Sequence, residues 1–334
     1  MLRFVLRRAV QVVPTLVALS ALLFAWLRLL PGGPAAALLG DKATPEKIEA
    51  LNRTLGLDRP LPEQYLRFLG RVLTGDFGNS LVTADPVLTE LGRAFPATIE
   101  LSAAAMLIAV GLGIPLGYVS ARHRGGVLDT ATILGTLLGV AVPVFFLGYL
   151  LKYLFAVQWA LLPPSGRQSV DLDATRVTGF AVLDGLLTGE YDASWNAVEH
   201  LVLPALALAT IPLAVVVRIT RASVLDVLDE DYVRTAEAKG LARSTVRWRH
   251  VLRNALLPVS TTVGLQTGLL LAGAVLTEKV FVWNGVGSLL AEGIQRRDYP
   301  RLQALILVVA VVYVVINLAV DLSYALIDPR VRVR

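Results

Sequence analysis

The sequence predicts an all-α integral membrane protein with six transmembrane helices and with both termini in the cytoplasm. Three observations lead to this fold class. Apolar residues make up 55% of the 334 residues, charged residues make up 17%, and the mean hydropathy is +0.64, a balance outside the range of soluble domains. Six apolar segments are long enough to cross a bilayer, and the basic residues collect in alternate connecting loops.

Each predicted span approaches or exceeds the roughly 20 residues that a helix needs to cross the hydrocarbon core. The fourth is short and contains Pro204 and Pro212, so we expect a bend in its middle and ends that extend toward Glu199 or Ile219. The spans are residues 9–30, 98–120, 130–155, 201–217, 259–277 and 304–326.

The orientation follows from the basic residues. Arginine and lysine residues gather before the first span, between the second and third, between Arg218 and Arg253, and at the C-terminus. With six spans, all four regions lie on one side. The loops 31–96, 156–200 and 278–303 are balanced or acidic. The positive-inside rule therefore puts both termini in the cytoplasm, and an odd number of spans would break this agreement.

The chain divides into three regions. Residues 1–30 form a cytoplasmic N-terminus and the first transmembrane helix, residues 31–97 form an external cap, and residues 98–334 form a core of five transmembrane helices with a cytoplasmic loop at 221–258. The first span also has the basic start of a secretory signal. Its apolar run is longer than the about 7 to 15 residues of a signal core, so we expect it to stay attached.

The external cap contains two predicted amphipathic helices. Thr44 and Pro45 start the first and Gly56 ends it. The second covers residues 62–73 and is followed by a glycine-punctuated turn at 75–80. We expect a small cap that rests on the outer membrane surface, with direct contact to substrate as the alternative.

A hydrophilic stretch at 231–258 lies between two strongly apolar segments. Asp231 is suited to cap a short helix that Gly240 ends in a left-handed turn, and Ser244 is suited to cap a second helix that Pro258 closes. This pattern predicts a rigid helix pair on the cytoplasmic surface. Such a pair fits a groove in another subunit and transmits a push into the spans that it joins.

Small residues recur at four-residue spacing within the spans, and this pattern favours close packing of helices. A glycine-lined pore wall is the alternative, and a partner subunit is able to pack in the same way. Asp321 follows Asn317 by one turn on the same helix face and is predicted to assist packing. The small residues are Gly113 and Gly117, Gly135 and Gly139, and Gly264, Gly268 and Ala272.

Several functional classes lack their signatures. The chain has no cysteine, no phosphate-binding loop and no zinc or serine-hydrolase motif, so we predict no catalytic, cofactor or metal site. Basic residues beside spans serve topology, so nucleic acid is not an expected partner. A secondary carrier is disfavoured because clear carboxylates near the midplane are missing. A membrane-embedded hydrolase is disfavoured because Ser260 has no histidine at its depth.

Eight strings of the sequence carry a resemblance to one family. The chain resembles the permease subunit of binding-protein-dependent ABC importers of the dipeptide and oligopeptide group, over nearly its whole length. The strings are Leu55-Gly-Leu-Asp-Arg-Pro60, Gly75-Asp-Phe-Gly-Asn-Ser80, His200-Leu-Val-Leu-Pro204, Arg218-Ile-Thr-Arg-Ala-Ser223, Asp231-Tyr-Val-Arg-Thr-Ala-Glu-Ala-Lys-Gly-Leu241, Leu252-Arg-Asn-Ala-Leu-Leu-Pro258, Arg297-Asp-Tyr-Pro300 and Asp328-Pro-Arg-Val-Arg332.

The resemblance implies a type I ABC importer permease architecture and makes the hydrophilic stretch the coupling loop. The family pattern Glu-Ala-Ala, three residues, Gly is met here by Arg234, Thr235, Ala236 and Gly240, without the glutamate. A second departure is Asn284, where the family usually has proline. The implied docking residues are Tyr232, Arg234, Ala236, Lys239, Gly240 and Leu241, with Arg243 at the edge.

The resemblance also implies the partners and the setting. These are a second permease subunit that forms a heterodimer with this one, two cytoplasmic ATPase subunits that bind ATP and Mg, an extracytoplasmic solute-binding protein, membrane lipid and a peptide substrate. This chain itself would hold no cofactor. The implied location is the inner membrane of a prokaryote. Nickel chelates, glutathione and oligosaccharides are alternative cargoes within the same family.

Overall fold

The computed structural model describes residues 2–29, 35–36, 39–40 and 43–327 of the chain. Within these ranges the protein is built of helices, and its extended pairing is an isolated bridge between Asn79 and Pro86. Three described helices are long and apolar enough to cross a membrane. The number rises to five if each of two bent helix pairs is one span, and α1 adds a shorter apolar helix, Val13–Trp26. The predicted all-α class agrees with this architecture.

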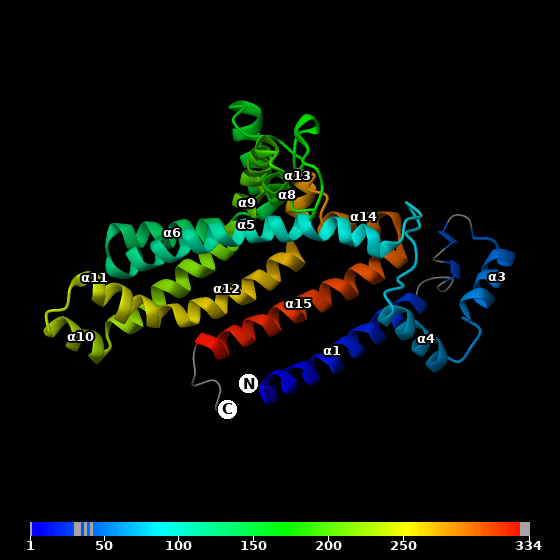
Figure 1. Cartoon of the computed structure of the whole chain (residues 1–334), viewed down its shortest axis with the longest axis horizontal. Helices are drawn as coiled ribbons and strands as arrows, with labels where there is room; N and C mark the ends of the chain where they lie inside the picture. Colours follow the sequence, from blue (N-terminus) through cyan, green and yellow to red (C-terminus); the bar gives the residue numbers. More distant parts are fainter. Residues whose placement is uncertain (1, 30–34, 37–38, 41–42, 328–334) are drawn as a thin grey trace.

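Two long helices form the centre of the molecule (Figure 1). They are α5 (Val87–Arg122) and α9 (Tyr191–Leu228), and both are longer than the predicted second and fourth spans. Pro204 and Pro212 lie inside α9. The main core cluster joins alanine and leucine side chains of α5 and α9 to Trp283, whose indole donates to the carbonyl oxygen of Ala97 at 2.8 Å.

The predicted third span is broken. It consists of α6 (Val127–Ala141), then α7 (Val144–Leu151) and a π-helix, η2 (Lys152–Gln158), and the two halves are bent by 100°. The prediction of one continuous helix is therefore wrong. The physical reason is Pro143, which has no N–H to donate and forces the preceding Val142 into an extended conformation, with φ −82° and ψ 123°.

The C-terminal half contains the remaining spans. A hairpin of α10 (Asp231–Ala238) and α11 (Arg243–Thr245) is followed by a π-helix, η4 (Val246–Leu252), and by α12 (Arg253–Gly273). Then come α13 (Val275–Phe281), α14 (Val286–Arg296) and α15 (Tyr299–Ile327). The fifth predicted span, 259–277, thus crosses the junction between α12 and α13.

The predicted external cap contains the two expected helices. They are α3 (Pro45–Leu55), with Thr44 as its N-cap and Gly56 in the left-handed conformation after it, and α4 (Leu61–Leu73). Phe68 of α4 packs with Leu23 and Phe24 of α1 (Leu2–Arg28) and with Leu307 of α15. The second helix therefore rests on the protein's own helices.

The connection between η2 and α9 contains two shorter elements. A 3-10 turn, η3 (Val170–Leu172), is followed by α8 (Ala181–Thr188). The Asp184 carboxylate in α8 accepts hydrogen bonds from Thr178 and from the backbone N–H of Gly179. These bonds hold the connection against the start of α8.

The two ends of the helical bundle differ (Figure 1). The N-terminal end of α1 and the C-terminal end of α15 both point toward the side that carries α10 and α11. The helices α3, α4 and α14 lie toward the opposite side. We refer to these sides as the hairpin end and the cap end.

Candidate functional sites at the two ends of the bundle

The hairpin end presents the turn expected from the sequence. Gly240 has φ +70°, a left-handed conformation that favours glycine, and its N–H donates to the carbonyl oxygen of Glu237 at 2.9 Å. The predicted cap is wrong by one residue. Asp231 is the first residue of α10, and its exposed carboxylate lies 3.7 Å from Arg234, whereas Glu230 occupies the N-cap position without a side-chain cap.

The second helix of the hairpin differs from the prediction. It begins at Arg243, with Ala242 at the N-cap, so Ser244 lies inside it and caps nothing. Pro258 does not close it either, because Pro258 lies inside α12. Proline has no N–H, so one backbone carbonyl in the preceding turn lacks its helical hydrogen bond. In a packed bundle, groups of neighbouring helices are able to satisfy that carbonyl. The helical path therefore continues from Arg243 to Gly273.

One face of α10 is packed against the rest of the chain. Val233 is 2% exposed and Ala236 is 5% exposed, and they lie in a cluster with Ala121, Val224, Val251 and Ala255. Ala236 is thus turned inward and is not presented to a partner. The other predicted docking residues are exposed: Tyr232, Arg234, Lys239, Gly240, Leu241 and Arg243.

Two of the predicted packing glycines lie at the contact between α5 and α9. A Cβ atom on Gly113 would lie 2.7 Å from Cγ1 of Val216, and one on Gly117 would lie 2.7 Å from the carbonyl oxygen of Val217. Such distances exclude any larger side chain unless the helices move apart. The backbones approach closely because these positions are glycine.

The other predicted packing positions differ in how closely a neighbouring helix approaches them. A Cβ on Gly268 would lie 2.9 Å from the ring of Tyr313 and 3.7 Å from Oδ1 of Asn317, an atom that is buried without a hydrogen-bond partner among the described residues. Gly264 is buried. Gly135 meets nothing within 4 Å, and Gly139 meets only the carbonyl oxygen of Thr210 at 4.0 Å. The side chains of Asp321 and Ala272 lie outside the described residues.

A bidentate ion pair that the sequence reasoning missed ties three helices together near the hairpin end. The Arg221 guanidinium donates to both carboxylate oxygens of Asp129, at 2.7 and 2.8 Å. Ser120 and the backbone N–H of Gly125 also donate to this carboxylate, which is 3% exposed. Four donors offset the desolvation of the buried charge. The string 218–223 contains Arg221 and was the available signal.

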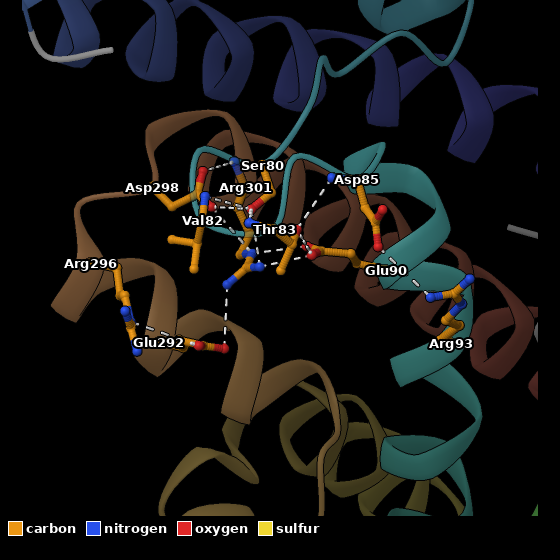
Figure 2. Close-up of polar contacts among 10 residues, drawn as sticks. All are labelled: Ser80, Val82, Thr83, Asp85, Glu90, Arg93, Glu292, Arg296, Asp298 and Arg301. Carbon is orange, nitrogen blue, oxygen red and sulfur yellow. Dashed lines mark hydrogen bonds and ion pairs between the residues drawn. The ribbon is translucent and has the colours of Figure 1, made fainter. Parts of the chain in front are cut away.

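A second buried network lies at the cap end (Figure 2). Arg301, which is 1% exposed, donates through Nε and Nη2 to the two carboxylate oxygens of Glu90, at 2.9 and 2.8 Å. Its Nη2 also lies 3.1 Å from Oγ of Ser80, which donates to Asp298 at 2.6 Å. Nη1 lies 3.4 Å from a carboxylate oxygen of Glu292. One arginine therefore links three carboxylates.

The same network contains residues from two of the strings that carry the family resemblance, 75–80 and 297–300. Ser80 ends the glycine-punctuated turn, in which Gly75 and Gly78 have φ +77° and +78°, and its Oγ accepts from the N–H groups of Val82 and Thr83. Asp298 comes from the string 297–300. The turn is thus fastened to the start of α15 (Figure 2).

A further buried carboxylate was also missed. Glu278 is 0% exposed and accepts hydrogen bonds from Oγ1 of Thr98 at 2.7 Å and from the N–H of Ser288 at 2.8 Å. Ser288 is in the first turn of α14, where the carboxyl oxygens satisfy an N–H group that has no partner within the helix. Asn284, the position where the family usually has proline, has φ +53°, which proline cannot adopt.

Known proteins match this chain over its full length. Residues 113–333 match the family model of the binding-protein-dependent transport system inner membrane component, and residues 1–102 match the model of the N-terminal part of the same systems' membrane component. The dipeptide transport system permease protein DppB of Escherichia coli is 45% identical over 336 residues, with 99% of each chain covered.

Two further relatives have similar descriptions. The di/tripeptide transport system permease protein DppB of Pseudomonas aeruginosa is 46% identical over 334 residues, with 99% of each chain covered. The probable D,D-dipeptide transport system permease protein DdpB of Escherichia coli is 44% identical over 304 residues, which cover 91% of this chain and 89% of that protein. The chain therefore belongs to the family of inner membrane components of binding-protein-dependent transport systems.

Proposed function

We propose that this chain is the permease subunit of an ATP-driven importer of di- and oligopeptides and that it forms half of the translocation pathway. The observation that carries the proposal is the 45% identity to a dipeptide permease over 99% of both chains. The exposed helical hairpin at one end of the bundle supports it from the structure.

The proposed topology has six spans, with both termini in the cytoplasm of a prokaryote and the chain in its inner membrane. In this proposal the three long helices, the two bent pairs and the shorter apolar helix of α1 would each make one crossing. The described ends of α1 and α15 point toward the hairpin end in Figure 1, in keeping with an even number of crossings. The basic residues between Arg218 and Arg253 belong to the same end.

The hairpin is the proposed contact with an ATPase subunit. Six exposed residues, Tyr232, Arg234, Lys239, Gly240, Leu241 and Arg243, would form the docking surface, and the inward-facing Val233 and Ala236 would hold α10 to α9 and α12. Two ATPase subunits that close on ATP and Mg would draw the hairpins of two permease subunits together. ATP must favour one state by differential binding, and the hairpin is where that free energy enters this chain.

Peptide is the proposed cargo, delivered by an extracytoplasmic solute-binding protein into the pathway between this chain and a second, different permease subunit. A permease for nickel chelates, glutathione or oligosaccharides is the alternative within the family. A secondary carrier is the alternative of another class. The bidentate ion pair of Asp129 with Arg221 argues against it, because the arginine already neutralises this carboxylate.

The first test is purification of the full chain from its native membrane in mild detergent. We expect two ATPase chains and a second permease to purify with it, and we expect di- and tripeptides presented with the binding protein to stimulate ATP hydrolysis. Peptide uptake by this chain alone in liposomes, driven by an ion gradient, would replace the proposal with a secondary carrier.

The second test addresses the hairpin. Gly240→Glu puts a side chain on a left-handed residue, which costs roughly 1 kcal/mol, and it adds a charge to the docking surface. We expect ATP hydrolysis that peptide no longer stimulates. Gly189→Glu is the matched control, because Gly189 has φ +77°, open space around it and no place in the hairpin. Equal coupling in both variants would contradict the placement of the docking surface.

A further inference from the structure

We propose that a groove near the hairpin end binds one anionic phospholipid, with the headgroup phosphate on Arg122 and Arg247. The groove has a volume of about 510 Å³ and lies between the C-terminal end of α5 and the helix formed by η4 and α12. This lipid site is separate from the proposed transport function and rests on it only in placing the groove on the cytoplasmic side of the membrane.

The groove has an apolar wall and a basic rim. Ile114, Pro115, Leu252 and Leu256 line the wall, whereas Arg122, His123, Arg247 and Trp248 line the rim. None of the ten lining residues is acidic. A molecule with two apolar chains and a negatively charged head complements both parts, and basic pockets between transmembrane helices on the cytoplasmic side are suited to anionic lipid headgroups.

The two arginines have no acidic partner in the described part of the chain. Neither Arg122 nor Arg247 forms an ion pair there, in contrast to Arg221, which is held by Asp129. Nε of Arg247 is buried without a hydrogen-bond acceptor, and its guanidinium carbon lies 5.6 Å from the centre of the Tyr118 ring. A guanidinium without an ion-pair partner favours a negatively charged acceptor, and a phosphate supplies several oxygens.

The depth of the groove favours a lipid over a soluble phosphate. Arg122 is in the last turn of α5, a helix long and apolar enough to cross a membrane, so the rim lies at the membrane boundary. Ile114 precedes Arg122 by eight residues, or about 12 Å along the helix, so the wall lies at the level of acyl chains. Trp248 is 66% exposed at the rim, where indole rings suit the interface.

The experiment measures quenching of Trp248 fluorescence by lipids with brominated acyl chains. The full chain is reconstituted into vesicles of phosphatidylcholine that contain a small fraction of brominated phosphatidylglycerol or, in a second arm, of brominated phosphatidylcholine. The Trp248 signal is the difference between the wild-type protein and Trp248→Phe, which removes the contribution of the other four tryptophans. We expect stronger quenching by brominated phosphatidylglycerol than by the zwitterionic lipid.

Charge variants identify the site. Because each arginine near an anionic headgroup contributes about 1 kcal/mol, Arg122→Gln with Arg247→Gln is expected to weaken the preference for phosphatidylglycerol by roughly 30-fold. Arg124→Gln with Arg249→Gln is the matched control, since these exposed residues stand two positions away, remove the same charge and do not line the groove. Arg122→Lys with Arg247→Lys keeps the charge and is expected to retain most of the preference.

Three outcomes would overturn the proposal. Equal quenching of Trp248 by both brominated lipids would mean that Trp248 only contacts the bulk bilayer. An equal loss of the preference for phosphatidylglycerol in both double glutamine variants would mean that the preference comes from general surface charge. Relief of quenching by millimolar inorganic phosphate would make the groove a soluble anion site. Protection of Trp248 from both lipids in the complex with the ATPase and the second permease, but not in the isolated chain, would make it a protein interface.

Discussion

Substitution of Gly117 by alanine tests the packing of the two central helices. A Cβ at this position would lie 2.7 Å from the carbonyl oxygen of Val217 and from Cβ of Thr220. Ordinary contacts begin at 3.4 Å, so α5 and α9 must separate locally by about 0.7 Å. Overpacking of this kind costs about 1–3 kcal/mol, partly offset by the roughly 0.5–1 kcal/mol that alanine gains over glycine in a helix.

Thermal unfolding of the purified chain in mild detergent measures the effect. We expect Gly117→Ala to lower the Tm by up to about 4 °C. Gly135→Ala is the matched control, because a Cβ there meets nothing within 4 Å and only the helix preference changes. We expect it to leave the Tm unchanged or to raise it. Equal effects of the two substitutions would refute the argument that close approach requires Gly117.

Three further predictions concern polar groups and backbone strain. Glu90→Gln leaves Arg301 buried with a weakened partner and is expected to cost about 3–5 kcal/mol by detergent melting, whereas Glu63→Gln, at an exposed ion pair, is expected to cost less than about 1 kcal/mol; similar costs would contradict this ranking. Hydrogen bonds from Thr178 and the N–H of Gly179 outweigh burial and lower the pKa of Asp184. Because the folded-state pKa lies below the unfolded one, the carboxylate of Asp184 stabilises the protein above about pH 4 and loses this contribution as the pH falls. Melting temperatures measured from pH 7 to pH 3 should therefore fall more steeply for the wild-type protein than for Asp184→Asn. Asn284→Pro is expected to cost roughly 1–3 kcal/mol, since Asn284 has φ +53°, whereas Asn284→Gly is expected to be neutral; the opposite order of melting temperatures would exclude a left-handed residue there.

Local chemistry made part of this fold predictable from sequence. Gly56 and Gly240 end helices in left-handed conformations because glycine alone adopts them without steric cost, and both positions were predicted. The bounds of α3 and α4 agree with the prediction to within one residue. Each of these features depends on residues only a few positions apart.

Features decided by distant contacts were not predictable in the same way. Pro204, Pro212 and Pro258 remain inside helices, whereas Pro143 breaks one, and the sequence around each proline does not separate the two outcomes. The helices α5 and α9 extend past the predicted apolar runs, and polar residues in these extensions have distant partners: Glu90 pairs with Arg301, and Arg221 pairs with Asp129.

The buried network at the cap end is a further case. Glu90 and Arg301 are separated by 211 positions, and no periodicity connects them. The strings 75–80 and 297–300 were both among those that carry the family resemblance, but their mutual contact through Ser80 and Asp298 appeared only in the folded chain.

The unbroken helical path from Arg243 to Gly273 has a mechanical consequence. Its 31 residues, at about 1.5 Å each, make a lever arm of roughly 45 Å. A tilt of only about 5° at one end would displace the other end by about 4 Å. No loop interrupts this path between the hairpin and Gly273 to absorb the rotation, so in the proposed topology a small swivel of the hairpin would reach the opposite leaflet enlarged.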